Sequence, residues 1–214
     1  MRFRAGPILI DCVIAAAGGS TRMGRPKQLL PFGPEGSGLT MLGSVVAAAL
    51  EAGCRALVVL GCRAAEVEAS LRGGPLGPAL ASGLVAAVPN PRWEEGMLGS
   101  IQAALGQVRG EAFFEMHADM PLVPASAYGL LAAARDARRR AGLPEAALFA
   151  SFRGEPGHPV LIPSAWIPEI LGLEPGSRLK PFLAARGMDL VEAGDPAVLA
   201  DLDTPEEYRR ARGS

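Results

Sequence analysis

The chain has 214 residues, of which 49% are hydrophobic and 20% are charged, and its formal net charge is −1. This length is enough for one α/β domain with a substantial core, and the balanced charge gives no electrostatic reason to expect binding to nucleic acid or to an anionic membrane. Aromatic residues make up 5% of the chain, which leaves no stacking surface for single-stranded nucleic acid.

From the N-terminal region, the apolar runs and the cysteines, we expect a cytoplasmic protein with no export signal and no membrane span. The N-terminus is basic, but Pro7 and Asp11 interrupt the apolar run behind it, unlike in a secretory signal. No apolar run is long enough to span a bilayer. The three cysteines form no C-x-x-C pair and have no histidine at zinc-binding spacing. We therefore expect reduced, mostly buried thiols at Cys12, Cys54 and Cys62.

The first predicted element is a buried strand that leads into a glycine-rich loop. Residues 8–17 form an apolar run that ends at Gly18 and Gly19, and a polar, cationic loop follows as far as Lys27. Glycine lets the backbone approach a ligand closely, and free N–H groups and cations can face phosphates. The pattern is typical of a nucleotide-phosphate loop. The structural alternative is a glycine-rich turn whose cations are simply solvated.

Helices and strands alternate along the rest of the chain. Helices are expected at residues 41–52, 64–71, 101–105, 124–140, 165–171, 179–185 and from 205 onward, and further strands at 55–60, 84–88, 112–116, 146–152, 158–162 and 189–192, with a loop at 73–78. This alternation predicts a mostly parallel sheet with helices on both faces, in a single Rossmann-like three-layer α/β/α domain over residues 1–214. Ligands of such sheets bind beyond the carboxyl ends of the strands, which gathers Gly18, Asn90 and Asp119 at one edge.

The glycine spacing of the first loop decides among three phosphate-binding patterns. A P-loop requires G-x-x-x-x-G-K-[ST], but Arg-Pro follows Gly19 and Gly24 here. A dinucleotide fingerprint requires G-x-G-x-x-G, which the glycines do not fit. The remaining pattern is A-A-x-G-G-x-x-R-M-G-x-x-K-x-L, in which Arg22 and Lys27 supply the cations.

Three aspartates are candidate metal ligands. Asp119 follows an apolar strand and precedes Met-Pro, and Mg²⁺ typically takes one or two carboxylates plus substrate oxygens. Asp201 and Asp203 occupy alternate positions of an expected strand, so that both would point the same way and one could complete the site. The structural alternatives are helix-terminal roles, with Asp119 as an N-cap and Asp203 beside a Thr204 cap.

Five separated elements resemble, in the same order, those of the nucleotidyltransferases that attach nucleotides to the molybdenum cofactor. They are the A-A-x-G-G loop, one region that holds V-x-N-P with Asn90 and G-M-x-x-S with Ser100, the sequence HADMP around Asp119, G-H-P-V with His158, and DLDTPEE with Asp201 and Asp203. Ser100 is expected to begin a helix, where it would either meet a phosphate or serve only as a cap.

The resemblance implies a nucleotidyltransferase with the nucleotide-diphospho-sugar transferase fold. The implied catalytic residues are Arg22, Lys27 and Asp119, and Asp119 would hold Mg²⁺ or Mn²⁺ with Asp201 or Asp203. The implied nucleotide-binding residues are Ala16, Ala17, Gly18, Gly19, Arg22, Lys27, Pro89, Asn90 and Ser100. The acceptor would meet His158 and Arg178.

The resemblance is closest to the cytidylyl-transferring members of this family, and it implies transfer of CMP from CTP to the terminal phosphate of molybdopterin, with release of pyrophosphate. A phosphate monoester has a second pKa of about 6 and is already largely dianionic at pH 7. No general base is then needed, in agreement with a chain that holds two histidines.

Several alternatives stay open. Leu173–Arg178 keeps only Gly176 and Arg178 of the family's G-D-x-G-A-R, so the acceptor could be another small phosphorylated molecule such as a sugar phosphate. The nucleotide could be GTP, although guanylyl-transferring relatives tend to carry Asn where Asp201 and Asp203 stand.

A non-catalytic nucleotide or pterin sensor is a further alternative. A molybdoenzyme or its chaperone is the protein partner that the resemblance allows, and the chain could be a monomer or a small homo-oligomer.

Overall fold

A seven-stranded sheet forms the centre of the protein, in the strand order β3-β2-β1-β4-β6-β5-β7. The structure, a computed structural model, describes residues 10–19, 26–174 and 176–212. The strands are β1 (Asp11–Ala15), β2 (Arg55–Leu60), β3 (Val85–Pro89), β4 (Ala112–His117), β5 (Ala147–Phe152), β6 (Glu155–Pro163) and β7 (Met188–Glu192). Within this sheet β6 runs antiparallel to both of its neighbours, and every other pairing is parallel.

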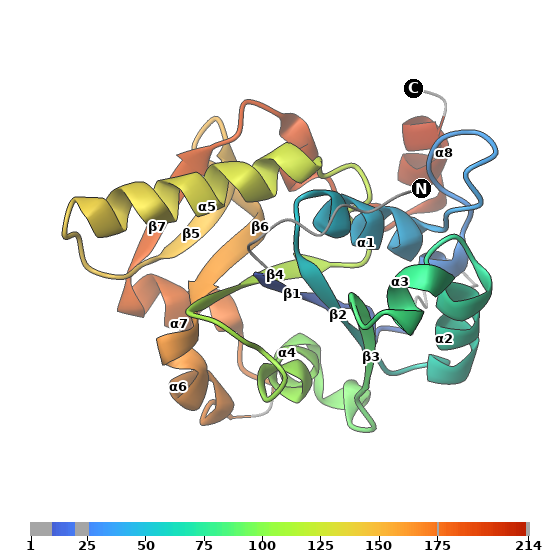
Figure 1. Ribbon diagram of the computed structural model, residues 1–214, viewed down its shortest axis with the longest axis horizontal. Coiled ribbons are helices and arrows are strands. Elements are labelled where there is room, and N and C mark those ends of the chain that lie inside the picture. The colour runs from blue at the N-terminus through green and yellow to red at the C-terminus, as the bar shows by residue number, and fades with distance from the viewer. Residues whose placement is uncertain (1–9, 20–25, 175, 213–214) are drawn as a thin grey trace.

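Helices cover both faces of the sheet (Figure 1). They are α1 (Met41–Glu51), α2 (Ala64–Gly73), α3 (Gly77–Ala81), α4 (Met97–Leu105), α5 (Ala125–Arg140), α6 (Ile167–Leu171), α7 (Leu179–Arg186) and α8 (Pro205–Arg212). Helices α1 and α5 lie on one face, whereas α4, α6 and α7 lie on the other. The predicted mostly parallel, three-layer α/β/α fold is confirmed.

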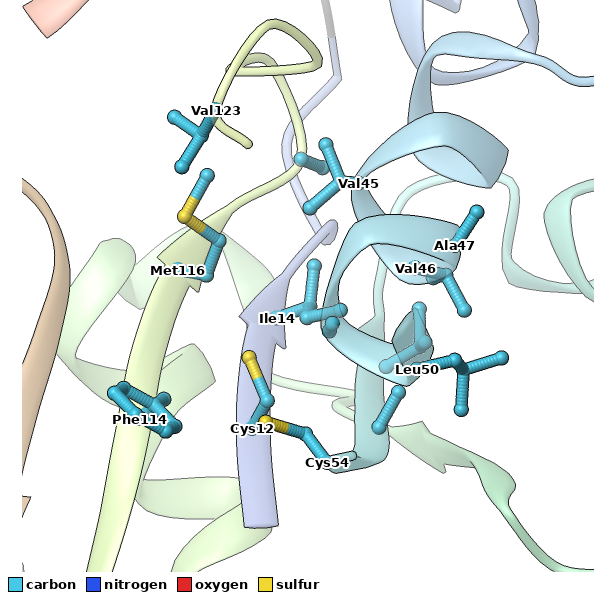
Figure 2. Packing of buried hydrophobic residues seen from close by; sticks show 14 of the residues in the cluster. Cys12, Ile14, Val45, Val46, Ala47, Leu50, Cys54, Phe114, Met116 and Val123 are labelled. Carbon is cyan, nitrogen blue, oxygen red and sulfur yellow. The ribbon is translucent and has the colours of Figure 1, made fainter. Parts of the chain in front are cut away.

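The alternation of side chains along each strand divides the core into two parts. Cys12 and Ile14 of β1 point to the face covered by α1, and Val13 between them points to the face covered by α4. Figure 2 shows the first face, where Ile14 of β1, Met116 of β4 and Val45 of α1 belong to one cluster of buried side chains. Because both faces are buried, the strands read as nearly continuous apolar runs, which made them easy to predict.

Two local expectations were wrong. The predicted loop at residues 73–78 runs into the short helix α3, which begins at Gly77 and has a proline in its first turn. The predicted strand that would carry Asp201 and Asp203 does not form, and residues 200–203 have no regular secondary structure. There the Leu202 amide donates to the Asp119 carbonyl at 2.8 Å, which ties the segment to the turn after β4 and not to a strand.

The predicted helix caps are confirmed for α1 and α8. The Thr40 hydroxyl accepts a hydrogen bond from the Gly43 amide at 3.1 Å. At α8 the Glu207 amide donates to Thr204 Oγ1 at 3.2 Å, and Glu207 Oε2 accepts in return from the Thr204 amide at 2.8 Å. This reciprocal pair is a capping box.

The strand order changes direction between β1 and β4. The chain runs outward from β1 through β2 to β3 and then returns to place β4 on the other side of β1. In open α/β sheets the crevice outside the carboxyl ends at such a point is the usual ligand site. The glycine loop leaves β1 there, and Asp119 follows β4 at the same edge. In the described part of the chain, none of the helices has the length and apolar character needed to cross a membrane.

Candidate active site

A buried glutamine holds the backbone on either side of the glycine loop. Gln28 Nε2 donates to the Ala16 carbonyl at 3.2 Å and to the Gly18 carbonyl at 2.7 Å. Ala16 and Ala17 are buried, whereas Gly18 is exposed at the end of the strand and Gly19 is half-buried. Sequence reasoning missed Gln28, although an amide directly after the cationic Lys27 was a usable signal. Arg22 lies outside the described residues.

Lys27 brings two distant carboxylates together at this edge. Its Nζ donates to Asp119 Oδ2 at 2.7 Å and to Asp203 Oδ1 at 2.6 Å. Burial by itself would lower the pKa of Lys27, but the hydrogen bonds and charges of the two aspartates outweigh it and raise the pKa. Lys27 is therefore an ammonium ion at neutral pH, fixed between the turn after β4 and the segment before α8.

The aspartates at this edge still have capacity for a cation. Asp119 Oδ1 is buried and has no hydrogen-bond partner among the described residues. Asp201 is exposed over most of its surface. Partial burial of its carboxyl, followed by the charges of Asp203 and Asp119, raises its pKa. A hard divalent cation prefers carboxylate oxygens such as these, so the donor set fits Mg²⁺ or Mn²⁺.

Packing of the C-terminal helix sets the position of Asp203. Leu202 and Tyr208 enter a small apolar cluster with Leu30, Phe32 and Met41. The Tyr208 hydroxyl also donates to the Pro31 carbonyl at 2.6 Å. The same contacts hold the segment that follows Lys27, because Leu30 and Pro31 belong to it. The cluster therefore positions Lys27 and Asp203 together, 176 residues apart in sequence.

Asn90 and Ser100 contact each other inside the protein. Asn90 Nδ2 donates to Ser100 Oγ at 3.2 Å, and both residues are buried. The expectation that Ser100 begins a helix was wrong, since α4 starts at Met97 after Gly96, whose φ of +106° favours glycine. Ser100 lies one turn inside the helix, and Pro89 is exposed at the end of β3. This hydrogen bond connects the carboxyl end of β3 to helix α4.

A cavity of about 270 Å³ lies between the sheet and helices α4 and α7, and both predicted acceptor residues, His158 and Arg178, line it. Its walls are largely apolar, with Leu98, Ile101, Phe149, Val160 and Leu183 among them, and Glu115, His117, Arg178 and Lys180 add charge. The cavity therefore combines a hydrophobic surface with a few polar groups, as small-molecule sites usually do.

Two histidines and a buried glutamate meet in the wall of this cavity. Glu115 Oε1 lies 3.1 Å from His117 Nε2, Glu115 Oε2 lies 3.1 Å from His158 Nε2, and the ring centroids are 4.2 Å apart. Glu115 and His117 share a face of β4 because they are two residues apart. Glu115 pairs with Val160 across the antiparallel ladder, and two further steps of this register set His117 opposite His158. Sequence reasoning missed Glu115, whose signal was a charge inside an apolar strand.

The charged groups of this cluster shift one another's pKa values in favour of the ionised forms. Burial would raise the pKa of the Glu115 carboxyl, but the two histidines hold it well below its usual range. Burial would likewise lower the pKa of His117, yet the charge of Glu115 raises it to about 9. In the absence of a metal, Glu115 is therefore an anion and His117 an imidazolium at neutral pH. The ligand atoms of the three residues lie within 4.8 Å of one another, which also makes them a candidate metal-binding group.

Comparisons with known proteins show which chains this one resembles in sequence and fold. The family model for the MobA-like NTP transferase domain matches residues 12–191. The chain is 27% identical over 203 residues to the molybdenum cofactor cytidylyltransferase of Escherichia coli (strain K12), with 95% of each chain covered. A nucleotidyl transferase from Methanothermobacter thermautotroptrophicus is 26% identical, with a TM-score of 0.72 and 96% of each chain covered. The structure of Rv0371c from Mycobacterium tuberculosis H37Rv in complex with manganese is 25% identical, with a TM-score of 0.65, over 97% of this chain and 100% of that one.

Proposed function

The chain belongs to the MobA-like NTP transferase family, and we propose that it transfers CMP from CTP to the terminal phosphate of molybdopterin and releases pyrophosphate. The observation that carries this proposal is the contact of Lys27 with Asp119 and Asp203 beside the glycine loop. The contact lies at the edge of the sheet where nucleotides bind in such folds. The similarity to the E. coli cytidylyltransferase favours CTP over GTP as the donor.

Each group at the edge has a role in this reaction. The glycine loop accommodates the ribose and phosphates of the nucleotide, and Gln28 holds the loop in place. Lys27, together with Arg22, neutralises the triphosphate. Asp119 with Asp201 or Asp203 would hold Mg²⁺ or Mn²⁺, which when bound would neutralise the charge that develops on the phosphates.

The acceptor phosphate attacks the α-phosphorus of the nucleotide in line with the departing pyrophosphate. A new bond forms between an acceptor oxygen and the α-phosphorus, and the bond from the α-phosphorus to the bridging oxygen of the β-phosphate breaks. Because the attacking phosphate is already ionised at pH 7, no side chain needs to remove a proton. Positioning and charge neutralisation then account for the rate enhancement.

The cavity beside α4 and α7 suits the proposed acceptor. Its apolar walls could pack against a flat ring system, and its volume of about 270 Å³ is close to the lower end of the range of small-ligand pockets, about 300–1,000 Å³. Arg178 and Lys180 line the cavity and are exposed, where they could meet a phosphate group. His158, the fourth residue of β6, lies on the same wall.

Two measurements on the purified protein test this function. Thermal shift against CTP, GTP, ATP and UTP with Mg²⁺ identifies the donor, because a ligand at about 100 times its Kd stabilises the native state by about 2.7 kcal/mol. Pyrophosphate release from the stabilising nucleotide is then followed with molybdopterin and with sugar phosphates as acceptors. CTP-selective stabilisation and molybdopterin-dependent release are expected. Stabilisation by GTP alone would indicate guanylyl transfer instead of cytidylyl transfer. Nucleotide binding without pyrophosphate release with any acceptor would indicate a non-catalytic sensor.

A further inference from the structure

We propose that Glu115, His117 and His158 form a binding site for a divalent transition metal of the Zn²⁺ class. The site would use one carboxylate and two imidazoles in the wall of the cavity between the sheet, α4 and α7. Its ligands differ from the aspartates proposed to hold Mg²⁺, and its occupancy does not depend on nucleotidyl transfer.

The distances already approach those of a metal centre. Zn²⁺ binds histidine nitrogen and carboxylate oxygen at about 2.0–2.2 Å, so neighbouring ligand atoms of a tetrahedral site lie about 3.3 Å apart. Both contacts of Glu115, to His117 Nε2 and to His158 Nε2, measure 3.1 Å. The ligand atoms of all three residues lie within 4.8 Å of one another. Small rotations of the two rings, with release of the proton that His117 carries in the metal-free protein, would therefore admit the ion.

Glu115 is the most buried of the three residues, and one of its oxygens has no well-aligned hydrogen bond. Its side chain is 4% exposed, compared with 27% for His117 and 22% for His158. Its Oε1 lies close to His117 but makes no hydrogen bond to any described residue. A buried carboxylate with an unsatisfied oxygen is costly in free energy. A metal ion would use that oxygen as a ligand without requiring hydrogen-bond alignment.

The donor set selects the class of metal. Imidazole nitrogen suits Zn²⁺, Cu²⁺, Fe²⁺ and Ni²⁺, whereas Mg²⁺ prefers oxygen ligands. Two histidines and one glutamate make up the protein ligands of many catalytic zinc sites, in which a fourth position stays open for water or substrate. Because all three side chains line the cavity, that open position would face into it. If the cavity binds the acceptor, which rests on the proposed function, the metal would bind an anionic donor atom of the acceptor.

Metal binding to the protein alone tests the site. Protein stripped with chelator is titrated with Zn²⁺, and with Co²⁺ as a spectroscopic probe, in the absence of nucleotide and acceptor. We expect about one equivalent of Zn²⁺, a Co²⁺ visible spectrum typical of four or five nitrogen and oxygen ligands, and no displacement by excess Mg²⁺. Mutating a residue that hydrogen-bonds to a metal ligand typically costs about 10–100-fold in metal affinity, so the loss of a direct ligand in Glu115→Gln or His158→Ala should cost about 100-fold or more.

Two control variants remove competing sites. Asp119→Asn disrupts the aspartate group and Cys62→Ser removes the half-buried thiol, and both should bind Zn²⁺ like the wild type. The proposal is overturned if the wild type binds no Zn²⁺ at micromolar concentration, or if folded Glu115→Gln and His158→Ala both bind it normally. Loss of Zn²⁺ binding in Asp119→Asn alone would assign the ion to the aspartates and also overturn it. Failure of nucleotidyl transfer would instead appear as absent pyrophosphate release by the wild type, whatever its Zn²⁺ content.

Discussion

Lys27 Nζ lies 2.7 Å from Asp119 Oδ2, although 92 residues separate the two in sequence. The contact joins the loop that leaves β1 to the turn that leaves β4, and it crosses the point where the strand order changes direction. A second contact, of 2.6 Å to Asp203, connects the same ammonium to the C-terminal segment. Three separate parts of the chain therefore fix one charge in place before any ligand binds, which is the arrangement that electrostatic catalysis requires.

Replacing Lys27 should remove this charge. We expect Lys27→Ala to lower the rate of pyrophosphate release by about 100-fold or more, as the loss of preorganised electrostatic contacts does in other enzymes. The matched control is Arg72→Ala, which deletes a cation whose partner, Glu68, lies on the surface of α2. If a folded Lys27→Ala variant released pyrophosphate at the wild-type rate, Lys27 would not be a catalytic residue.

The metal requirement can be tested at Asp119. Asp119→Asn retains the main-chain oxygen that accepts from Leu202 but replaces one carboxylate oxygen by an amide. We expect a loss of about 100-fold in turnover, and we expect chelator to abolish wild-type turnover until Mg²⁺ or Mn²⁺ is restored. Undiminished turnover of the wild type in excess chelator would show that the reaction needs no dissociable metal.

Gln28 should position the glycine loop. Gln28→Ala leaves the carbonyl oxygens of Ala16 and Gly18 without their donor, which should lower the free energy of unfolding by about 1–3 kcal/mol and raise the KM for the nucleotide. Gln102→Ala is the matched control, because Gln102 Nε2 donates to two carbonyl oxygens on the acceptor side, of Ile170 and Leu173. Urea unfolding should show similar losses in both variants, with a nucleotide KM that rises only in Gln28→Ala. Equal KM values would contradict a positioning role.

Gly157 should tolerate no side chain. A Cβ at this position would lie 2.0 Å from the Val198 carbonyl oxygen, which is a main-chain atom. We expect Gly157→Ala to lower the free energy of unfolding by about 3 kcal/mol or more, at the upper end of overpacking effects. In contrast, Gly129 lies inside α5 with no atom near its Cβ position, and Gly129→Ala should stabilise by about 0.5–1 kcal/mol. Two variants of equal stability in urea would show that β6 and Val198 are not packed as described.

The buried thiol of Cys54 predicts a specific pH dependence. Burial, assisted by the charge of Asp11, raises its pKa from 9.0 to about 12. The folded pKa is the higher one, so the stabilisation is fully present below pH 9 and is lost as the pH rises toward 12. Between pH 8.5 and 10.5 the wild type should lose about 2 kcal/mol more unfolding free energy than Cys54→Ala. If the unfolding free energies of the two proteins, measured in urea, changed in parallel with pH, the Cys54 thiol would not have the raised pKa of a buried group.

The sequence by itself determined the fold class and most elements of the chain. Buried strands such as β2 and β4 carry unbroken apolar runs, and helix boundaries carry local signals such as the Thr40 and Thr204 caps, so short-range physical chemistry was sufficient to find them. The carboxyl-edge rule then predicted that the loop after β1 and the turn after β4 would share one edge. Ser100 and the segment of Asp201 and Asp203 were misassigned because their conformations depend on contacts with distant residues.

Only the tertiary structure decided how the site is assembled. The antiparallel register that pairs Glu115 with Val160 also brings His117 beside His158. A shift of one residue would turn the side chains of β6 to the opposite face. That register depends on hydrogen bonds and packing between strands about 40 residues apart, which no local sequence pattern encodes. The same holds for Lys27 and Asp203, which meet because Leu202 and Tyr208 are buried against the segment that follows Lys27.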